Sequence, residues 1–282
     1  MTSSYRANCD PETIEGFGDE WAAFDQSGID PAELRRMFDR YFNIFPLREL
    51  SKAEGFDLGC GSGRWAALVA PRVGKLHCID PALKALDVSR RRLRGAENVE
   101  FHLAAANEIP LEEESQDFGY SLGVLHHVPN TELAMAHCVA KLKPGAPFLV
   151  YLYYKLENRP SWYRALWRAS ETGRRAVSRL PFPLRRAASE AIAAFAYFPL
   201  SRAARLAERA GMDVSGWPLS AYRLSSYYTL RTDALDRFGT SLEQRFSKNE
   251  IHSMMDRCGL VDLRFSNEPP YWVAVGRKKA RA

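Results

Sequence analysis

The chain has 282 residues, of which 46% are hydrophobic and 26% are charged, and its formal net charge is +5. This length suits one large or two modest globular domains, and the composition excludes disorder on a large scale. No apolar run approaches the roughly 20 residues that span a bilayer. The first residues also lack the basic-then-apolar pattern of a signal peptide. The mild positive charge neither demands nor excludes an anionic partner.

The cysteines indicate a reducing compartment. Their number is odd, and their spacing fits neither disulfide pairs nor a metal-ligand set. The sequence therefore predicts a soluble cytoplasmic protein with reduced thiols and no metal. The cysteines are Cys9, Cys60, Cys78, Cys138 and Cys258.

Residues 18–50 are predicted to be helical. Apolar and aromatic side chains recur there at helical spacing, and Asp30 and Pro31 have the residue types of a helix cap and a first helical position. Most of these side chains are expected to pack on the rest of the fold. They are Trp21, Phe24, Met37, Phe38, Tyr41 and Phe42.

Strands and helices alternate through residues 54–154. Such alternation with short connections predicts a parallel, doubly wound sheet that binds ligands at the carboxyl ends of its strands. Strands are expected at 54–58, 76–80, 99–104, 117–123 and 147–154, with helices at 63–70, 82–94 and 131–142.

A glycine-rich turn follows the first of these strands. Gly59, Gly61 and Gly63 stand on alternate positions directly after Asp57-Leu58, and Asp80 ends the next strand. Glycines allow left-handed dihedrals and let a ligand lie against bare main chain at a helix start. An acid at the end of the second strand can accept both hydroxyls of a ribose. A dinucleotide fingerprint would carry its third glycine at position 64, where this chain has arginine, so NAD binding is the weaker alternative.

The last strands of such a sheet come late in the chain. Ser247 and Glu250 form a capping box for a helix over 248–258, and strands are predicted at 260–266 and 271–276. Residues 155–246 are therefore an insertion after the fifth strand. Its helices are expected near 160–180 and 184–198, with Pro199 breaking the apolar stretch before a further helix that reaches Gly211.

The first inserted helix is amphipathic. Its apolar stripe comprises Trp162, Leu166, Ala169, Gly173, Val177 and Leu180, and the opposite side carries Arg164, Arg168, Arg175 and Arg179. We expect this helix to pack its apolar stripe on the core and to expose its arginines. The alternative is a peripheral membrane or anionic-ligand contact through those arginines.

The motifs of residues 50–154 resemble the class I S-adenosylmethionine-dependent methyltransferases. They are DLGCGSG from Asp57, Asp80, Asn107 to Pro110, the YSLGVLHHV segment from Tyr120 to Val128, and Leu142 to Gly145. The resemblance implies an α/β, Rossmann-like sheet of seven strands with N-terminal helices and a helical insertion. It implies a methyltransferase core at 51–154 and 247–282, an N-terminal helical lid at 1–50, and a cap or acceptor-binding region at 155–246.

The resemblance also implies which residues hold the cofactor, S-adenosyl-L-methionine. Asp57 and the turn Gly59, Cys60, Gly61 and Gly63 would surround its methionine end, with Asp80 and Pro81 at the ribose. Ala106 and Asn107 would lie at the adenine, because Ala105 lacks the acid that many relatives carry there. Leu122 and Gly123 would face the amine and the sulfonium.

His126 and His127 follow the fourth strand, where an acceptor would approach the methyl group. Histidine suits proton transfer near neutral pH, so either is a candidate general base, and a packing role is the alternative. The candidate acceptor residues are Trp21, Tyr151, Tyr153, Tyr227, Tyr228 and Arg231. Tyr151 and Tyr153 share one side of their strand, and Tyr154 lies on the other.

The predicted function is methylation of a small or medium organic acceptor, favoured at oxygen: a sugar, lipid-linked or secondary-metabolite hydroxyl. The alternatives are a methyltransferase whose insertion docks on a membrane or partner, and an NAD-dependent oxidoreductase. The segment from Asn267 to Trp272 echoes the Pro-Pro-aromatic element of enzymes that grip a flipped base. Its position between the last two strands favours a turn, so no nucleic-acid partner is expected.

Overall fold

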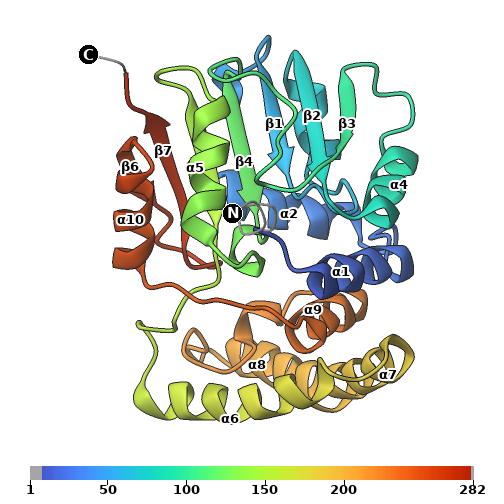
Figure 1. Ribbon diagram of the computed structural model, residues 1–282. Helices are drawn as coiled ribbons and strands as arrows, with labels where there is room; N and C mark the ends of the chain where they lie inside the picture. Colours follow the sequence, from blue (N-terminus) through green and yellow to red (C-terminus); the bar gives the residue numbers. More distant parts are fainter. Residues whose placement is uncertain (1–7, 281–282) are drawn as a thin grey trace, which may run out of the picture. The chain divides into compact units, whose positions relative to one another are not determined.

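The computed structural model describes residues 8–280, and its centre is a seven-stranded sheet in the order β3-β2-β1-β4-β5-β7-β6 (Figure 1). Strands β1 to β5 pair in parallel, whereas β7 runs antiparallel to both of its neighbours. The predicted sheet is confirmed, with the difference that it is not wholly parallel. The strands are β1 Glu54–Leu58, β2 Lys75–Asp80, β3 Val99–Leu103, β4 Phe118–Leu122, β5 Pro147–Tyr151, β6 Leu260–Phe265 and β7 Val273–Lys278.

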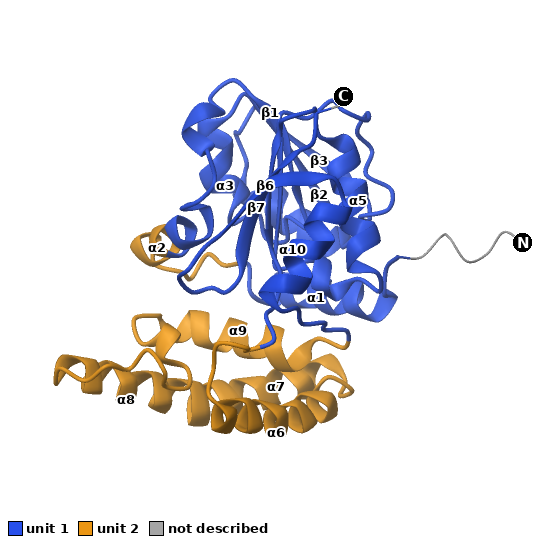
Figure 2. Ribbon diagram, turned by 90° about the vertical axis from the view of Figure 1, so that its left-hand side faces the viewer, with its two compact units in different colours: residues 1–25, 37–155, 242–282 blue, residues 26–36, 156–241 orange. Residues whose placement is uncertain are grey.

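Helices flank the sheet on both faces. Figure 2 views the sheet nearly edge-on, with α3 on one side and α5 and α10 on the other. The helices are α1 Pro11–Ala23, α2 Pro31–Phe42, α3 Ala66–Val69, α4 Leu83–Arg92, α5 Thr131–Lys141, α6 Ser161–Val177, α7 Phe182–Ile192, α8 Phe198–Arg209, α9 Tyr227–Gly239 and α10 Lys248–Arg257.

The chain divides into two compact units. Within the described chain, the first unit comprises residues 8–25, 37–155 and 242–280, and the second comprises 26–36 and 156–241. The core of the first unit lies between the sheet and helices α5 and α10, where Phe56, Phe148, Met135 and Met255 are buried. Leu58 belongs to the same cluster, so the end of β1 is fixed by packing before the glycine turn begins.

Several helices differ from their predicted bounds. α1 begins at Pro11, well before position 18, because Asp10 caps it: the Asp10 Oδ2 accepts from the Thr13 amide at 3.1 Å. The helix predicted at 63–70 shortens to Ala66–Val69, followed by a 3₁₀ turn. The start of α2 at Pro31 is confirmed, since the Asp30 carboxylate accepts from the amides of Ala32 and Glu33.

The second unit is built around α9. Leu230 and Ala234 of α9 are buried against Ala193 and Tyr197. Segment 26–36, predicted as part of the N-terminal helices, belongs to this unit because Glu33 is bonded to the start of α9. Its carboxylate accepts from the Ser226 amide at 3.0 Å and from the Thr229 hydroxyl at 2.8 Å. Residues 1–7 of the predicted lid segment lie outside the described residues.

Pro199 does not break the helix as predicted. The chain stays helical from α7 into α8 through a π-helical turn at Ala193–Tyr197, and Pro199 occupies the second position of α8. A proline cannot donate to the carbonyl one turn earlier and its ring crowds that carbonyl, and a locally widened turn relieves both effects. The two predicted helices therefore form one continuous helical segment, from Phe182 to Arg209, with a π-bulge at Ala193–Tyr197.

Helix α6 packs differently from the prediction. Its predicted apolar stripe faces solvent: Trp162 is 55% exposed and Leu166 is 54% exposed. The side that meets α9 is polar and aromatic instead. Arg174 is buried and donates to the Thr240 carbonyl at 2.6 Å. The expectation of an apolar stripe packed on the core is wrong, because a hydrogen-bonded arginine fills that position.

No helix within residues 8–280 combines the length and the apolar character that crossing a membrane requires.

The capping box of α10 is present as predicted. The Ser247 hydroxyl accepts from the Glu250 amide, and the Glu250 carboxylate accepts from the Ser247 amide at 2.7 Å. Replacing Ser247 by alanine should therefore lower the free energy of unfolding by about 1 kcal/mol. The measurement is the denaturant midpoint of unfolding. Asn249→Ala, an exposed change in the same helical turn, is the control and should leave that midpoint unchanged.

Candidate functional site

The glycine turn is anchored to the end of β2. The amides of Gly59 and Cys60 donate to the Ile79 carbonyl at 2.7 and 3.2 Å, and the Gly61 amide donates to the Asp80 Oδ2 at 2.9 Å. The turn lies where the strand order reverses between β1 and β4, which is the ligand-binding crevice of an open α/β sheet.

Two of the glycines are required by space as well as by backbone angle. Gly59 has φ +75°, and a Cβ built there would lie 2.3 Å from Val124. Gly63 has φ +73°, and its Cβ would lie 2.5 Å from the Ser89 hydroxyl. Any side chain at either position would displace the turn. The glycine pattern is therefore a geometric requirement of this site.

Asp57 is buried beneath the turn. It is 1% exposed, and its Oδ2 has no hydrogen-bond partner within residues 8–280. Burial raises the pKa of Asp57 to about 8; the neighbouring Tyr120 hydroxyl partly offsets this, and the nearby Asp80 adds to it. An acid held in this state is a candidate partner for a cationic or hydrogen-bond-donating ligand.

Asp80 closes β2 with both carboxylate oxygens in use. Its Oδ2 accepts from Gly61 and its Oδ1 accepts from the Ala82 amide at 2.9 Å, next to Pro81. Burial raises its pKa to about 6, and these two amides limit the rise. A carboxylate offers about four acceptor positions, so two remain for the hydroxyls of a ribose.

The adenine-side and amine-side residues lie at the same edge of the sheet. Ala106 is buried and Asn107 follows it in the loop after β3, with its Oδ1 buried and lacking a partner within the described chain. Leu122 ends β4, and the Gly123 amide donates to the Tyr151 carbonyl at 3.1 Å.

Several buried polar atoms in this region lack a protein partner within residues 8–280. Folded proteins satisfy nearly all such atoms, so a cluster of exceptions indicates a bound ligand or water. Two are acceptors suited to the amino groups and hydroxyls of S-adenosylmethionine, and two are hydroxyls. The residues present therefore fit this cofactor. The atoms are Asp57 Oδ2, Asn107 Oδ1, Ser62 Oγ and the Tyr120 hydroxyl.

The two histidines occupy different environments. His126 is fully buried, with its ring centroid 3.9 Å from that of Tyr153. Burial holds the pKa of His126 well below its usual range, and His127 and Arg245 lower it further. These surroundings oppose proton uptake by His126.

His127 has an ordered hydrogen bond. Its Nδ1 lies 2.7 Å from the Leu242 carbonyl, which can only accept, so Nδ1 carries the proton and Nε2 is the basic nitrogen. The ring of Phe17 meets His127 edge-on, with centroids 4.9 Å apart. This fixed tautomer suits a general base better than the environment of His126 does.

The tyrosines after β5 divide as predicted. The rings of Tyr151 and Tyr153 lie 5.8 Å apart on one side, beside the histidines, whereas Tyr154 lies 5.5 Å from Tyr271. The guanidinium of Arg245 lies 5.0 Å from the Tyr153 ring centroid.

Three predicted acceptor residues belong to the second unit. Tyr227 and Tyr228 begin α9, where the Tyr228 hydroxyl accepts from the Gln26 amide at 3.0 Å. Arg231 forms an ion pair with Glu190, so its charge is compensated within that unit. Their acceptor role stays a prediction.

A different segment returns to the histidines. The amide of Gln244 donates to the His126 carbonyl at 3.0 Å, and the amide of Phe246 donates to the Tyr153 carbonyl at 2.8 Å. Residues 242–246 carry no motif, so periodicity alone could not have identified them. The fold places them there because Phe246 pairs in parallel with Tyr154, shortly after β5, before the chain enters α10.

Trp21 and Arg64 cover the glycine turn. A Cβ on Gly61 would lie 3.0 Å from the Trp21 indole nitrogen. The Arg64 guanidinium lies 5.8 Å from the Trp21 ring centroid and 4.5 Å from that of Trp65. Trp21 was predicted as an acceptor residue. The sequence motifs do not identify Arg64 as a residue of the site. Its position directly after the third glycine is the signal that could have identified it.

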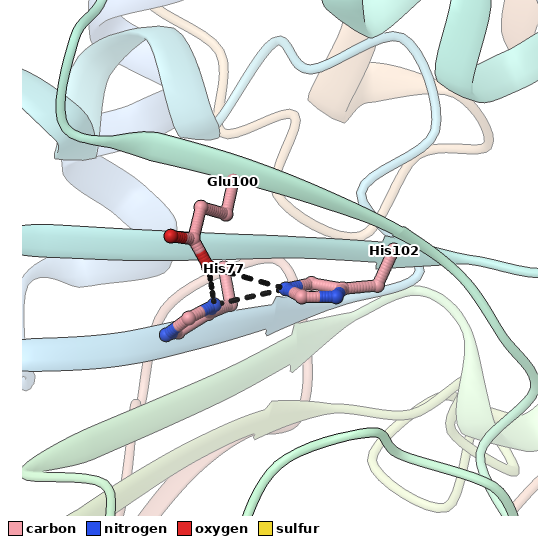
Figure 3. A group of neighbouring side chains, drawn as sticks. All are labelled: His77, Glu100 and His102. Atoms are coloured by element: carbon pink, nitrogen blue, oxygen red, sulfur yellow. Dashed lines mark hydrogen bonds and ion pairs between the residues drawn. The ribbon is translucent and has the colours of Figure 1, made fainter.

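A second polar cluster lies on β2 and β3, at His77, Glu100 and His102 (Figure 3). Sequence spacing predicted no metal, yet the ligand atoms of these residues lie within 4.8 Å of one another. Their hydrogen bonds account for the arrangement: His77 Nε2 lies 2.7 Å from Glu54, and His77 Nδ1 lies 2.9 Å from His102 Nε2.

The charges around this cluster also oppose a metal ion. The Lys75 ammonium lies 2.9 Å from Glu100 and 3.7 Å from Glu54, where it would repel a dication. We therefore assign the cluster a structural part in joining β2 to β3.

Asp57→Asn should stabilise the ligand-free protein in a pH-dependent way. Because the pKa of Asp57 is about 8 in the folded state and an ordinary aspartate has a pKa of 3.8, the folded state binds the extra proton and stability falls as pH rises between those values. The variant should match the wild type near pH 4 and should have a Tm higher by about 2 °C or more near pH 9.

Thermal unfolding across that pH range measures the effect. The exposed Asp87→Asn on α4 is the matched control and should follow the wild-type Tm throughout. A Tm difference for Asp57→Asn that does not change with pH would contradict the assignment of a buried, proton-binding carboxyl.

Comparison with known proteins agrees with this geometry. Residues 56–150 match the family model described as "Methyltransferase domain". The chain is 25% identical over 158 residues to a ubiquinone biosynthesis O-methyltransferase of Methylocella silvestris, covering 49% of this chain and 62% of that protein. It is also 25% identical to the 27-O-demethylrifamycin SV methyltransferase of Amycolatopsis mediterranei, covering 43% and 45%.

A solved structure shares the fold. Phosphoethanolamine N-methyltransferase 2 of Haemonchus contortus, solved with S-adenosylhomocysteine, superposes with a TM-score of 0.51 at 16% identity, covering 92% of this chain and 44% of that one. The chain therefore spans less than two thirds of the length of these curated relatives. Residues 56–150, which include the anchored glycine turn and Asp80, match a methyltransferase domain of the class I, S-adenosylmethionine-dependent type, and its subfamily is not identified.

Proposed function

We propose that this protein transfers a methyl group from S-adenosylmethionine to a small or medium organic acceptor, at an oxygen atom. The observation that carries the proposal is the set of acceptor atoms gathered around the anchored turn, above all the buried Asp57 and Asp80. A bare main-chain turn beside two buried acids suits a ligand with cationic and hydroxyl groups.

Alignment is the main task of the protein in such a reaction. When bound, the cofactor supplies a methyl group already activated on a sulfonium sulfur. Holding donor and acceptor in line can contribute about 7 to 11 kcal/mol, whereas a general base adds about 10²- to 10⁴-fold in rate. Asp80, the Gly59–Gly63 turn and Gly123 would do the holding, with Trp21 and Arg64 closing over the turn.

His127 is the proposed general base. Its Nδ1 bond to the Leu242 carbonyl leaves Nε2 as the proton acceptor, so a hydroxyl on the acceptor could pass its proton to Nε2 as the new C–O bond forms. His126, buried against Tyr153, would act as a positioning residue that supports His127. The need for a base is what favours oxygen over nitrogen, because an alcohol must lose its proton and a neutral amine already has a free electron pair.

The class of acceptor is the less constrained part of the proposal. The sequence relatives named above are O-methyltransferases by name, whereas the solved structure is an N-methyltransferase. Tyr151 and Tyr153 offer aromatic surface and hydroxyls beside His127, which suits a sugar, a lipid-linked group or a secondary metabolite carrying a hydroxyl.

Cofactor binding is tested by calorimetry with S-adenosylhomocysteine and with NAD. We expect binding of the first and none of the second. Asp80→Ala should weaken that binding by about tenfold or more, since a charged hydrogen-bond acceptor is worth about 1.5 to 3 kcal/mol. Asp87→Ala, on the exposed side of α4, should bind as the wild type does. Affinity for NAD alone would refute the proposal.

The part of His127 is tested with His127→Gln. Turnover should fall by about 10²- to 10⁴-fold while the affinity for S-adenosylhomocysteine changes by less than about twofold, because the base touches only the acceptor. His126→Gln is the comparison and should have a smaller effect on turnover. Wild-type turnover in His127→Gln would remove the assignment of a base.

The acceptor is identified by incubating extract with enzyme and cofactor. The substrate is the metabolite that gains one methylene, about 14 Da, when both the wild-type enzyme and the cofactor are present and not when either is left out.

A further inference from the structure

The helices of the second unit expose an unusual amount of apolar surface. Sixteen large apolar side chains are exposed within residues 8–280, and eight of them lie between Trp162 and Leu206. Phe195 is 85% exposed and Leu206 is 65% exposed. Between Leu180 and Leu206 every exposed residue is apolar. We call this surface, formed by α6, α7 and α8, the α6–α8 face.

Helix α6 is held within the unit by its polar and aromatic side, and its apolar stripe takes no part in those contacts. In both views α6, α7 and α8 form a layer on one side of α9 (Figures 1 and 2). Glu171 of α6 pairs with Arg174 at 2.6 Å and with Arg237 of α9 at 3.1 Å, and Arg237 lies over the Trp167 ring. Turning α6 to bury its apolar stripe would break these pairs. The outward orientation is therefore specified by the sequence.

The charge of the same helices is strongly positive. Residues 161–209 contain ten arginines and three glutamates, a net charge of +7, whereas the whole chain carries +5. Each glutamate is held in an ion pair within the unit: Glu171 with Arg174, Glu190 with Arg231 and Glu208 with Arg223. Arg168 and Arg175 are exposed on α6, on the side opposite its apolar stripe, and Arg179 is exposed just after the end of that helix.

We propose that the α6–α8 face is a docking surface for an anionic phospholipid bilayer, on which the three helices lie in the plane of the interface. Exposed apolar side chains on one side of a helix and arginines on its polar side are the features of helices that bind at a membrane interface. Arginine side chains can reach the lipid phosphates while the aromatic and aliphatic groups enter the acyl boundary. The proposal goes beyond methyl transfer and does not depend on it.

A second copy of the chain is a poorer occupant. Pairing two α6–α8 faces would bring two surfaces of net positive charge together, and their glutamates are already engaged within each unit. A bilayer supplies the apolar phase and the negative charge at once. The sequence predicts, as an alternative, a membrane contact through the arginines of the first inserted helix alone. In the docking proposed here, the exposed apolar side chains also enter the membrane.

The experiment is co-sedimentation of the full chain with vesicles of two compositions. One is phosphatidylcholine alone, and the other contains about 30 mol% phosphatidylglycerol. We expect binding to the anionic vesicles at low salt and weaker binding at high salt, because the ionic attraction is screened. Phe195→Ser combined with Leu206→Ser should reduce the bound fraction about fivefold or more, since both side chains are exposed and their loss leaves the fold intact.

The control combines Leu133→Ser with Val261→Ser, two exposed aliphatic positions of the first unit, and should bind as the wild type does. Arg168→Gln combined with Arg179→Gln should weaken binding to anionic vesicles and flatten its salt dependence. Calorimetry with S-adenosylhomocysteine on each variant separates this proposal from the proposed activity.

Three results would overturn the proposal. One is no binding to anionic vesicles at low salt. Another is equal binding by the Phe195 and Leu206 variant and by the wild type. The third is a concentration-dependent dimer that this variant abolishes, which would assign the face to a second copy of the chain.

Discussion

The hydrogen bonds between the glycine turn and the end of β2 are the constraint on which the site depends. Three consecutive amides, those of Gly59, Cys60 and Gly61, are held by the Ile79 carbonyl and the Asp80 carboxylate. These bonds tie the carboxyl end of β1 to that of β2 and set the position of Asp80. Since the core behind β1 is packed with large side chains, the turn cannot shift without disturbing the sheet.

A buried polar group that lacks a hydrogen-bond partner in the ligand-free protein contributes to ligand binding at this site. Asp57 is 1% exposed, its Oδ2 has no hydrogen-bond partner within residues 8–280, and burial raises its pKa to about 8. Such groups destabilise the ligand-free fold and gain partners when a ligand with donors arrives. His127 differs, because a main-chain carbonyl holds its tautomer before any ligand is present.

The second unit is held together differently from the first. Its helices are joined by arginine–glutamate pairs and by a small apolar core around α9, and several large apolar side chains between Trp162 and Leu206 are exposed. A globular domain normally buries such a surface. Its exposure is therefore typical of a surface that binds a membrane or another protein. Each of the three glutamates of residues 161–209 is paired with an arginine of the unit, and the remaining arginines leave these helices with a net positive charge.

The sequence by itself determined the strands, the glycine turn, Asp80 and the capping box of α10, because these depend on local periodicity, backbone angle and short-range hydrogen bonds. It also predicts an insertion at 155–246, whose length interrupts the alternation of strands and helices. The tertiary structure alone decided the rest. Which side of α6 packs inward depends on Arg237 and Thr240, more than sixty residues away.

Long-range contacts likewise distinguish the two histidines, since Leu242 bonds His127 and Tyr153 stacks on His126. Residues 242–246 reach the site with no motif to announce them, and segment 26–36 groups with α9 through Glu33. The physical reason is common to all of these: a side chain's neighbour in sequence fixes its local conformation, whereas its burial, its proton and its partner are set by chain segments that only the fold brings together.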